Sequence, residues 1–327
     1  MSRPVVPLLL LALLGACGTP EEKLSELSDT DATRYAAQAM HIAPISLSAL
    51  GTLLTSTETL VAGGSGGTTT TTAATPDVQI QSAATAEPQA AALATPTPRP
   101  CPAGGSVTAV LSGGNPVGQQ NGRFNQGETY DLTYTGCQPV SGLTLNGKAT
   151  LLIHSVDLAT GALDVTWTLN MLRLTRSTLA VQFTAGKIRQ VRSIDSSQRT
   201  RLDYSEGQWI TVLTIGTKLR PFTVSAVQAS TLADSSSLSV SGGLHTLSDG
   251  VISFDISQDG LNRHNLDGLP QQGNWILSRP NGRMRVQLDP AGVNWLRIDF
   301  DDDADGSIER SLASSPGSST LQNAIFN

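Results

Sequence analysis

The stretch Leu143-Thr-Leu-Asn-Gly-Lys-Ala-Thr-Leu-Leu-Ile153 shows most directly how this chain folds. Apolar side chains stand at its odd positions, with one glycine among them, and mainly polar side chains stand between them. A period of two residues over this length is typical of a β-strand with one buried and one solvated face. Val165, Trp167 and Leu169 alternate with threonines in the same way. We therefore expect both segments to be half-buried strands.

Turn signals recur at short intervals on both sides of these strands. They are Thr160-Gly161, Ala185-Gly186, Glu206-Gly207, Asn281-Gly282 and Asp305-Gly306. Strands this closely spaced pair as antiparallel neighbours, because parallel pairing needs long crossover connections. The sequence from residue 101 to 327 thus predicts a mainly β body, an antiparallel meander that forms two packed sheets or a partly closed barrel.

The composition excludes several classes of protein. Of the 327 residues, 15% are charged and 4% aromatic, which is unlike a coiled coil or a long helical bundle. The formal net charge is −6, so no overall basic field exists that would hold DNA or RNA. We therefore expect no nucleic-acid partner.

The N-terminus carries a secretion signal. The apolar run from Val5 to Leu14 is too short to cross a bilayer as a helix but suits a signal peptide. Directly after it, Leu14-Gly15-Ala16-Cys17 resembles the lipobox of bacterial lipoproteins. The resemblance implies removal of residues 1–16 and attachment of diacylglycerol and an N-acyl (palmitate-type) chain to Cys17. Gly18 after the cysteine implies the outer membrane of a Gram-negative cell, on its periplasmic or outer side. The alternative is an ordinary signal peptide in which Cys17 is incidental.

The other two cysteines, Cys101 and Cys137, form an even remainder. In an oxidising compartment such as the periplasm, such a pair predicts one disulfide. No CxxC motif or Cys/His cluster occurs in the sequence, which argues against redox catalysis and structural zinc.

Between the lipobox and the β body, the sequence divides into two parts. Residues 17–62 form a lipidated N-terminus with a short helical segment, which we expect as two pieces. The first begins at Asp29 or Thr30 and is interrupted by Pro44, and the second runs from Ser46 to Leu60. Residues 63–100 are mostly Gly, Thr, Ala and Pro, and are expected to be a disordered tether between the bilayer and the β body, residues 101–327.

An acidic segment near the C-terminus resembles the first half of an EF-hand calcium loop. Asp301, Asp303 and Asp305 stand at its positions one, three and five, Gly306 at six, and Glu309 at nine. Position twelve is a leucine, and the flanking residues read as strands. We expect either a weak Ca²⁺ site made by the three aspartates and Glu309, or a solvated acidic hairpin that deters edge-to-edge aggregation.

Basic residues concentrate between residues 171 and 220. If Ser196-Ser197 is a two-residue turn, Arg192, Arg199 and Arg201 share one face of a hairpin. Three guanidinium groups on one face would bind the phosphate or carboxylate of an envelope glycolipid. The alternative is an ordinary solvated sheet face.

Three classes of function follow from these features. The β body resembles uncharacterised β-rich lipoproteins of Gram-negative bacteria, and no convergent set of catalytic residues is visible in the sequence. We therefore expect a non-enzymatic binding or scaffold module, attached to the membrane by its lipid, with an envelope glycolipid or a protein as partner. One alternative is a carrier that holds an amphiphile in a β-barrel cavity. The other is a hydrolase of envelope glycans that uses carboxylates such as Asp255, Asp259 and Asp267.

Overall fold

The structure, a computed structural model, describes residues 23–62, 98–114, 124–157, 159–194, 199–234, 237–280, 282–289, 295–316 and 318–326. The expected signal peptide, Cys17, most of the tether and the Ser196-Ser197 turn lie outside these ranges. Lipidation and the tether therefore remain predictions.

One long helix and one large sheet make up the described part of the chain. The helices are η1 (Leu24–Glu26), α1 (Asp29–Ala62) and α3 (Ser318–Ala324). The strands are β1 (Arg99–Pro100), β2 (Ser106–Gly113), β3 (Thr129–Cys137), β4 (Leu143–Asp157), β5 (Ala162–Arg176), β6 (Leu179–Ile194), β7 (Thr200–Ile215), β8 (Lys218–Ala233), β9 (Leu238–Ser248), β10 (Ser253–Gln258), β11 (Asn262–His264), β12 (Pro270–Arg279), β13 (Gly282–Leu288), β14 (Leu296–Asp301) and β15 (Arg310–Ser314).

The predicted antiparallel meander is confirmed. All strands belong to one 15-stranded sheet in which sequence neighbours pair, apart from the short β11, which joins β9 and β12. The alternation predicted for residues 143–153 is also confirmed, because Leu145, Leu151 and Ile153 are buried while Asn146 and Lys148 are exposed. The sheet is continuous rather than split into two packed layers, and its two end strands, β1 and β15, each pair with one neighbour.

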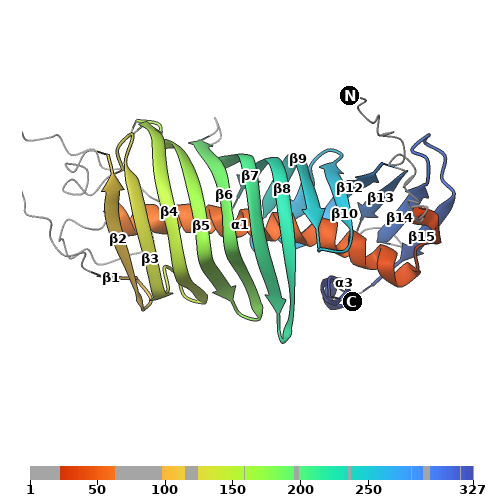
Figure 1. Cartoon of the computed structure of the whole chain (residues 1–327), viewed down its shortest axis with the longest axis horizontal. Helices are drawn as coiled ribbons and strands as arrows, with labels where there is room; N and C mark the ends of the chain where they lie inside the picture. The colour runs from red at the N-terminus through yellow and green to blue at the C-terminus, as the bar shows by residue number, and fades with distance from the viewer. Residues whose placement is uncertain are drawn as a thin grey trace, which may run out of the picture.

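The sheet curls around α1, which runs along its length and crosses beneath the strands (Figure 1). The strands follow the helix in reverse: β2 and β3 lie at its C-terminal end, and β14 and β15 at its start (Figure 1). Every residue from Tyr35 to Leu47 is buried, including the polar Gln38, His41 and Ser46, as expected of a helix that the protein encloses. The core of the molecule is therefore the contact between α1 and the concave face of the sheet.

The helix begins where the sequence provides a cap. Ser28 Oγ accepts a hydrogen bond from the Asp31 backbone N–H at 3.1 Å, and Asp29 and Asp31 stand in the first turn, where the helix dipole favours negative charge. The segment Asp29–Glu58 is long and apolar enough to cross a membrane, with a mean hydropathy of 1.2, but 67% of its most apolar window is buried within the protein.

The expected interruption at Pro44 is wrong, because α1, which is 34 residues long, runs through this proline without a break. A proline inside a helix lacks the N–H that would bond the carbonyl four residues earlier, here that of Met40. Met40, Ile42 and Ile45, on either side of the proline, are buried in the core between the helix and the sheet. Contacts with the surrounding sheet thus stabilise a helix that local propensity would divide.

Left-handed residues in the middle of neighbouring strands bend the sheet around the helix. Such positive φ angles occur at Gly147 in β4, Met171 in β5, Glu206 in β7, Ala226 in β8 and Gly242 in β9. In β4, β7 and β8 they coincide with shifts of the pairing register, which mark β-bulges. Bulges increase the local twist and bend of a strand, so a row of them gives the sheet its concave face.

Ala226→Gly is expected to raise the free energy of unfolding by about 1 kcal/mol, because the side chain is exposed and its φ of 54° strains any residue with a Cβ. Ala185 of β6 is the control, because it is also exposed but has no positive φ, so that glycine relieves no strain there. Ala185→Gly should lower stability by about 0.5–1 kcal/mol. Urea unfolding measures both, and equal signs would contradict the strain at residue 226.

Candidate functional site

The loop between β14 and β15 gathers carboxylates at one end of the molecule. Asp301, Asp303 and Asp305 each offer a carboxylate oxygen, and these oxygens lie within 4.8 Å of one another. Asp301 ends β14 and is fully buried, whereas Asp303 and Asp305 are exposed. A hydrogen bond from the Ser307 backbone lowers the pKa of Asp305, which keeps this carboxylate charged at neutral pH. Three of the four predicted metal ligands therefore converge.

The buried carboxylate of Asp301 is only partly satisfied. Its Oδ2 accepts hydrogen bonds from Arg283 Nε at 2.8 Å and from the Gly306 backbone at 3.1 Å. Its Oδ1 is buried without a hydrogen-bond partner in the part of the chain that the structure describes. Arg283 also donates to the Ala304 carbonyl at 2.7 Å, so one guanidinium holds both ends of the loop's first turn.

Glu309 does not join the three aspartates. Its Oε2 accepts a hydrogen bond from the Asp302 backbone at 2.8 Å, which ties the end of the loop to its start. The predicted direct role of Glu309 as a ligand is therefore not what the geometry favours. It shapes the loop instead.

The acidic loop also contacts the segment that precedes α1. Asp302 accepts hydrogen bonds from the Ser25 backbone at 2.8 Å and from Ser25 Oγ at 2.5 Å. Arg310, the first residue of β15, donates to the carbonyls of Ser25 and Leu27 and pairs with Asp29. These contacts fasten residues 25–29 to the same end of the sheet.

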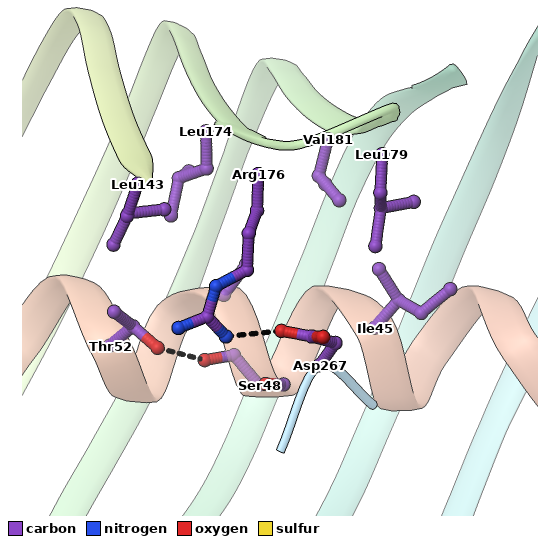
Figure 2. Close-up of a pocket in the computed structure, with 10 residues that line it drawn as sticks. Ile45, Ser48, Thr52, Leu143, Leu174, Arg176, Leu179, Val181 and Asp267 are labelled. Carbon is purple, nitrogen blue, oxygen red and sulfur yellow. Dashed lines mark hydrogen bonds and ion pairs between the residues drawn. The ribbon is translucent and has the colours of Figure 1, made fainter. Parts of the chain in front are cut away.

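The concave face holds little free space. A pocket of about 40 Å³ lies between α1 and the ends of β4, β5 and β6, lined mainly by apolar side chains such as Ile45, Leu174 and Val181 (Figure 2). This volume accommodates a few water molecules and is far below the few hundred Å³ that an amphiphile requires. A second hollow, of about 320 Å³, is a shallow polar depression among exposed residues such as Arg263, Gln272 and Gln287, and not a cavity between α1 and the sheet.

The loop between β11 and β12 packs over α1 beside the small pocket. Arg176 of β5 pairs with Asp267, which lies in the loop between β11 and β12 (Figure 2). Ser48 of α1 donates a hydrogen bond to the Leu266 carbonyl of the same loop at 2.5 Å. A Cβ at Gly268 would lie 2.5 Å from the Pro44 carbonyl oxygen, so this loop rests directly on the helix backbone. We call these contacts the α1 clasp.

The predicted shared face of Arg192, Arg199 and Arg201 is wrong. A turn at residues 196–197 would pair Arg192 with Arg201, but the observed register pairs Arg192 with Leu202. A difference of one residue turns a side chain to the opposite face of a sheet. Arg192 therefore points inward and pairs with Glu58 of α1 at 2.8 Å, while Arg201 is exposed and pairs with Asp203. Arg199 is exposed, just before β7.

The predicted disulfide is present. Cys101 and Cys137 are bonded, with their Cα atoms 5.4 Å apart, and join the connection between β1 and β2 to the end of β3. The bond closes a loop of 36 residues at the edge of the sheet, where pairing is weakest.

Two of the three carboxylates considered for catalysis, Asp255 and Asp267, have other partners, and for Asp259 the structure gives only a backbone hydrogen bond to the Asn274 carbonyl. Asp255 accepts a hydrogen bond from Thr246 Oγ1 at 2.8 Å on the exposed face of β10, and Asp267 belongs to the α1 clasp. These contacts give both side chains structural roles and favour no catalytic pair.

The burial of three histidines is not evident from the sequence. His41 of α1, His245 of β9 and His264 of β11 are all buried, although His264 stands in a polar stretch that reads as a loop. Burial lowers the pKa of His41 and of His245 to about 4. Burial and the nearby His41 lower the pKa of His264 to about 3. Asn262, Arg263 and His264 are all polar, so no apolar alternation in the sequence indicates that Asn262 and His264 are buried.

Comparison with known proteins gives no match: no family model, no curated protein and no solved structure is significantly similar to this chain.

Proposed function

We propose that this protein is a non-enzymatic lipoprotein of the outer membrane, anchored through Cys17, that acts as a binding or scaffold module of the cell envelope. The lipobox at Leu14 to Cys17 supports the anchor. The position of α1 supports the second part: the concave face, where a curled sheet would hold a ligand, is filled by the chain's own helix.

The convex face is left for partners. Along β5, β7 and β9 it carries the exposed apolar side chains Met171, Ile210 and Leu244 among polar neighbours. Exposed apolar side chains within a polar surface suit contact with a protein partner. The separation of Arg192 from Arg201 makes a glycolipid headgroup the weaker candidate for this face.

The carrier function remains the second candidate, because α1 covers a concave sheet face lined by apolar side chains, and this face would form a long apolar trough if the helix left it. Organic extraction of the purified protein, followed by mass spectrometry, separates the two functions. A binding or scaffold module should yield only the covalent lipid of Cys17. An additional amphiphile in stoichiometric amount would favour the carrier.

Cys17→Ser is expected to move most of the protein from the outer-membrane fraction to the soluble fraction, or to leave it unprocessed. Two or more acyl chains bind a membrane durably, whereas the chain without them has only its body to do so. Fractionation followed by immunoblotting measures the shift. Cys101→Ser serves as the control for loss of a cysteine and should leave the distribution unchanged. A Cys17→Ser protein that stays in the outer membrane would contradict the anchor.

The binding surface can be tested by photo-cross-linking in cells. A photoreactive phenylalanine at Ile210, on the convex face, should give a discrete adduct with a protein partner. The same label at Lys218, in the exposed end of β8, is the matched control. A label at residue 210 that gives no adduct, or the same adducts as residue 218, would contradict a partner on this face.

A further inference from the structure

The buried oxygen of Asp301 is the feature of the acidic loop that most needs an explanation. The side chain is fully buried, and Oδ1 has no hydrogen-bond partner among the described residues. A buried carboxylate oxygen that accepts no hydrogen bond is costly even when the carboxylate has an ion-pair partner, since burial removes its hydration. Arg283 bonds only Oδ2. A second cation at the loop would compensate the remaining oxygen.

The surroundings of Asp301 supply further ligands for such a cation. Oxygens from Asp303 and Asp305 lie within 4.8 Å of an oxygen from Asp301 and of each other. Two oxygens bound to one ion at 2.3–2.6 Å stand at most about 5 Å apart, so the three carboxylates are close enough to share a single Ca²⁺ after small adjustments of their side chains. Both outer aspartates are exposed, which leaves room for the waters that would complete the coordination.

We propose that Asp301, Asp303 and Asp305 bind one Ca²⁺ ion in the β14–β15 loop. All ligands are oxygens, and the exposed side of the site is adaptable, which suits a hard cation with six to eight ligands. Mg²⁺ requires a tighter octahedron at 2.0–2.1 Å and keeps several waters, so it fits this loop less well. The missing carboxylate at position twelve limits affinity, and we expect a Kd of about 10⁻⁴–10⁻³ M, as in extracellular calcium modules.

The ion would also stiffen the start of the folded body. Asp302, between two of the ligands, bonds Ser25, and Arg310 at the other end of the loop bonds the Ser25 and Leu27 carbonyls. A bound ion fixes the loop backbone on which these contacts depend. Residues 24–28 should therefore exchange their amide hydrogens more slowly in calcium, because local opening becomes rarer. This effect on the segment does not depend on the proposed membrane anchor.

Calorimetric titration of the full-length protein with CaCl₂ tests the proposal. We expect one site with a Kd near 10⁻⁴–10⁻³ M and at least tenfold weaker binding for Asp303→Ala and for Asp305→Ala. Both side chains are exposed, and melting temperatures without calcium check that the variants fold. Asp255→Ala removes a carboxylate of the exposed sheet face, outside the cluster, and should bind calcium as the parent does.

Three results would overturn the proposal. The first is absence of binding heat at 10 mM CaCl₂. The second is equal affinity in the parent and in both loop variants, which would place the ion elsewhere. The third is an identical rise in melting temperature with MgCl₂ or with NaCl at matched ionic strength, which would indicate general screening of the acidic loop.

Discussion

Gly268→Ala is expected to lower the free energy of unfolding by about 3 kcal/mol. The new Cβ would lie 2.5 Å from the carbonyl oxygen of Pro44 and 2.6 Å from the Cα of Ile45. Both are backbone atoms of a helix segment that is buried throughout, so neither moves aside at low cost. The φ angle of +81° adds a strain of about 1 kcal/mol for any residue with a Cβ. Urea unfolding followed by tryptophan fluorescence measures the loss.

Gly260→Ala is the matched control for this substitution. Gly260 has nearly the same φ, +82°, but a Cβ there would meet nothing within 4 Å. Gly260→Ala should therefore lower the free energy of unfolding only by the backbone strain, about 1 kcal/mol. The difference between the two variants reports the contact between the α1 clasp and the helix. Equal losses would show that the loop does not press on α1.

The clasp shows what kind of information the sequence lacks. Turn residues around Asn265 and Gly268 indicate a loop, but nothing local indicates that the loop rests on a helix more than 200 residues earlier in the chain. The same holds for Pro44: local rules predict a helix break there, and the enclosing sheet overrides them. The sequence predicted the elements, and the long-range packing decided their continuity and burial.

Strand faces were predictable only where the pairing register did not matter. In β4 the alternation alone identified the buried face, because five apolar residues share it. At the end of β6 the expected face depended on the turn after it, and a register different by one residue placed Arg192 against Glu58 of α1. A one-residue change reverses every side chain, so an uncertain turn cannot support a site built from both strands.

The acidic loop could be predicted only in part from the sequence. Its three aspartates are two residues apart, so one turn of chain brings them together, and the local spacing was sufficient to predict their convergence. Glu309 lies across the hairpin, and its hydrogen bond to the Asp302 backbone depends on how β14 and β15 pair. The sequence could not indicate that Asp301 is buried with a free oxygen, because this depends on the contact with Arg283 of β13.

Acidification from pH 6.5 to pH 4 is expected to destabilise the protein strongly, through the three buried histidines. The folded-state pKa values of His41 and His245 are about 4, and that of His264 about 3, all below the unfolded value of 6.5. The unfolded state therefore binds more protons in this window, and stability, complete above pH 6.5, is lost as the pH falls. The difference between the folded and unfolded pKa values corresponds to about 3 kcal/mol of unfolding free energy for a single histidine. Since the total free energy of unfolding of a folded domain is about 5–15 kcal/mol, we expect the protein to unfold between pH 4 and 5.

The histidines can be separated from the carboxylates by their pH windows and by substitution. Asp249 and Asp305 also have lowered pKa values, but their contribution is lost only below the ordinary value of 3.8. His245→Leu removes one buried titrating group whose Nε2 has no hydrogen-bond partner among the described residues, so little is lost at pH 7. Urea unfolding at pH 7 and pH 5.5, above the expected acid transition, should show a smaller loss of stability on acidification for His245→Leu than for the parent. His154→Gln, on the outer face where His154 bonds Thr166, should behave as the parent. An equal loss in all three proteins would mean that acid acts elsewhere than on the contact between α1 and the sheet.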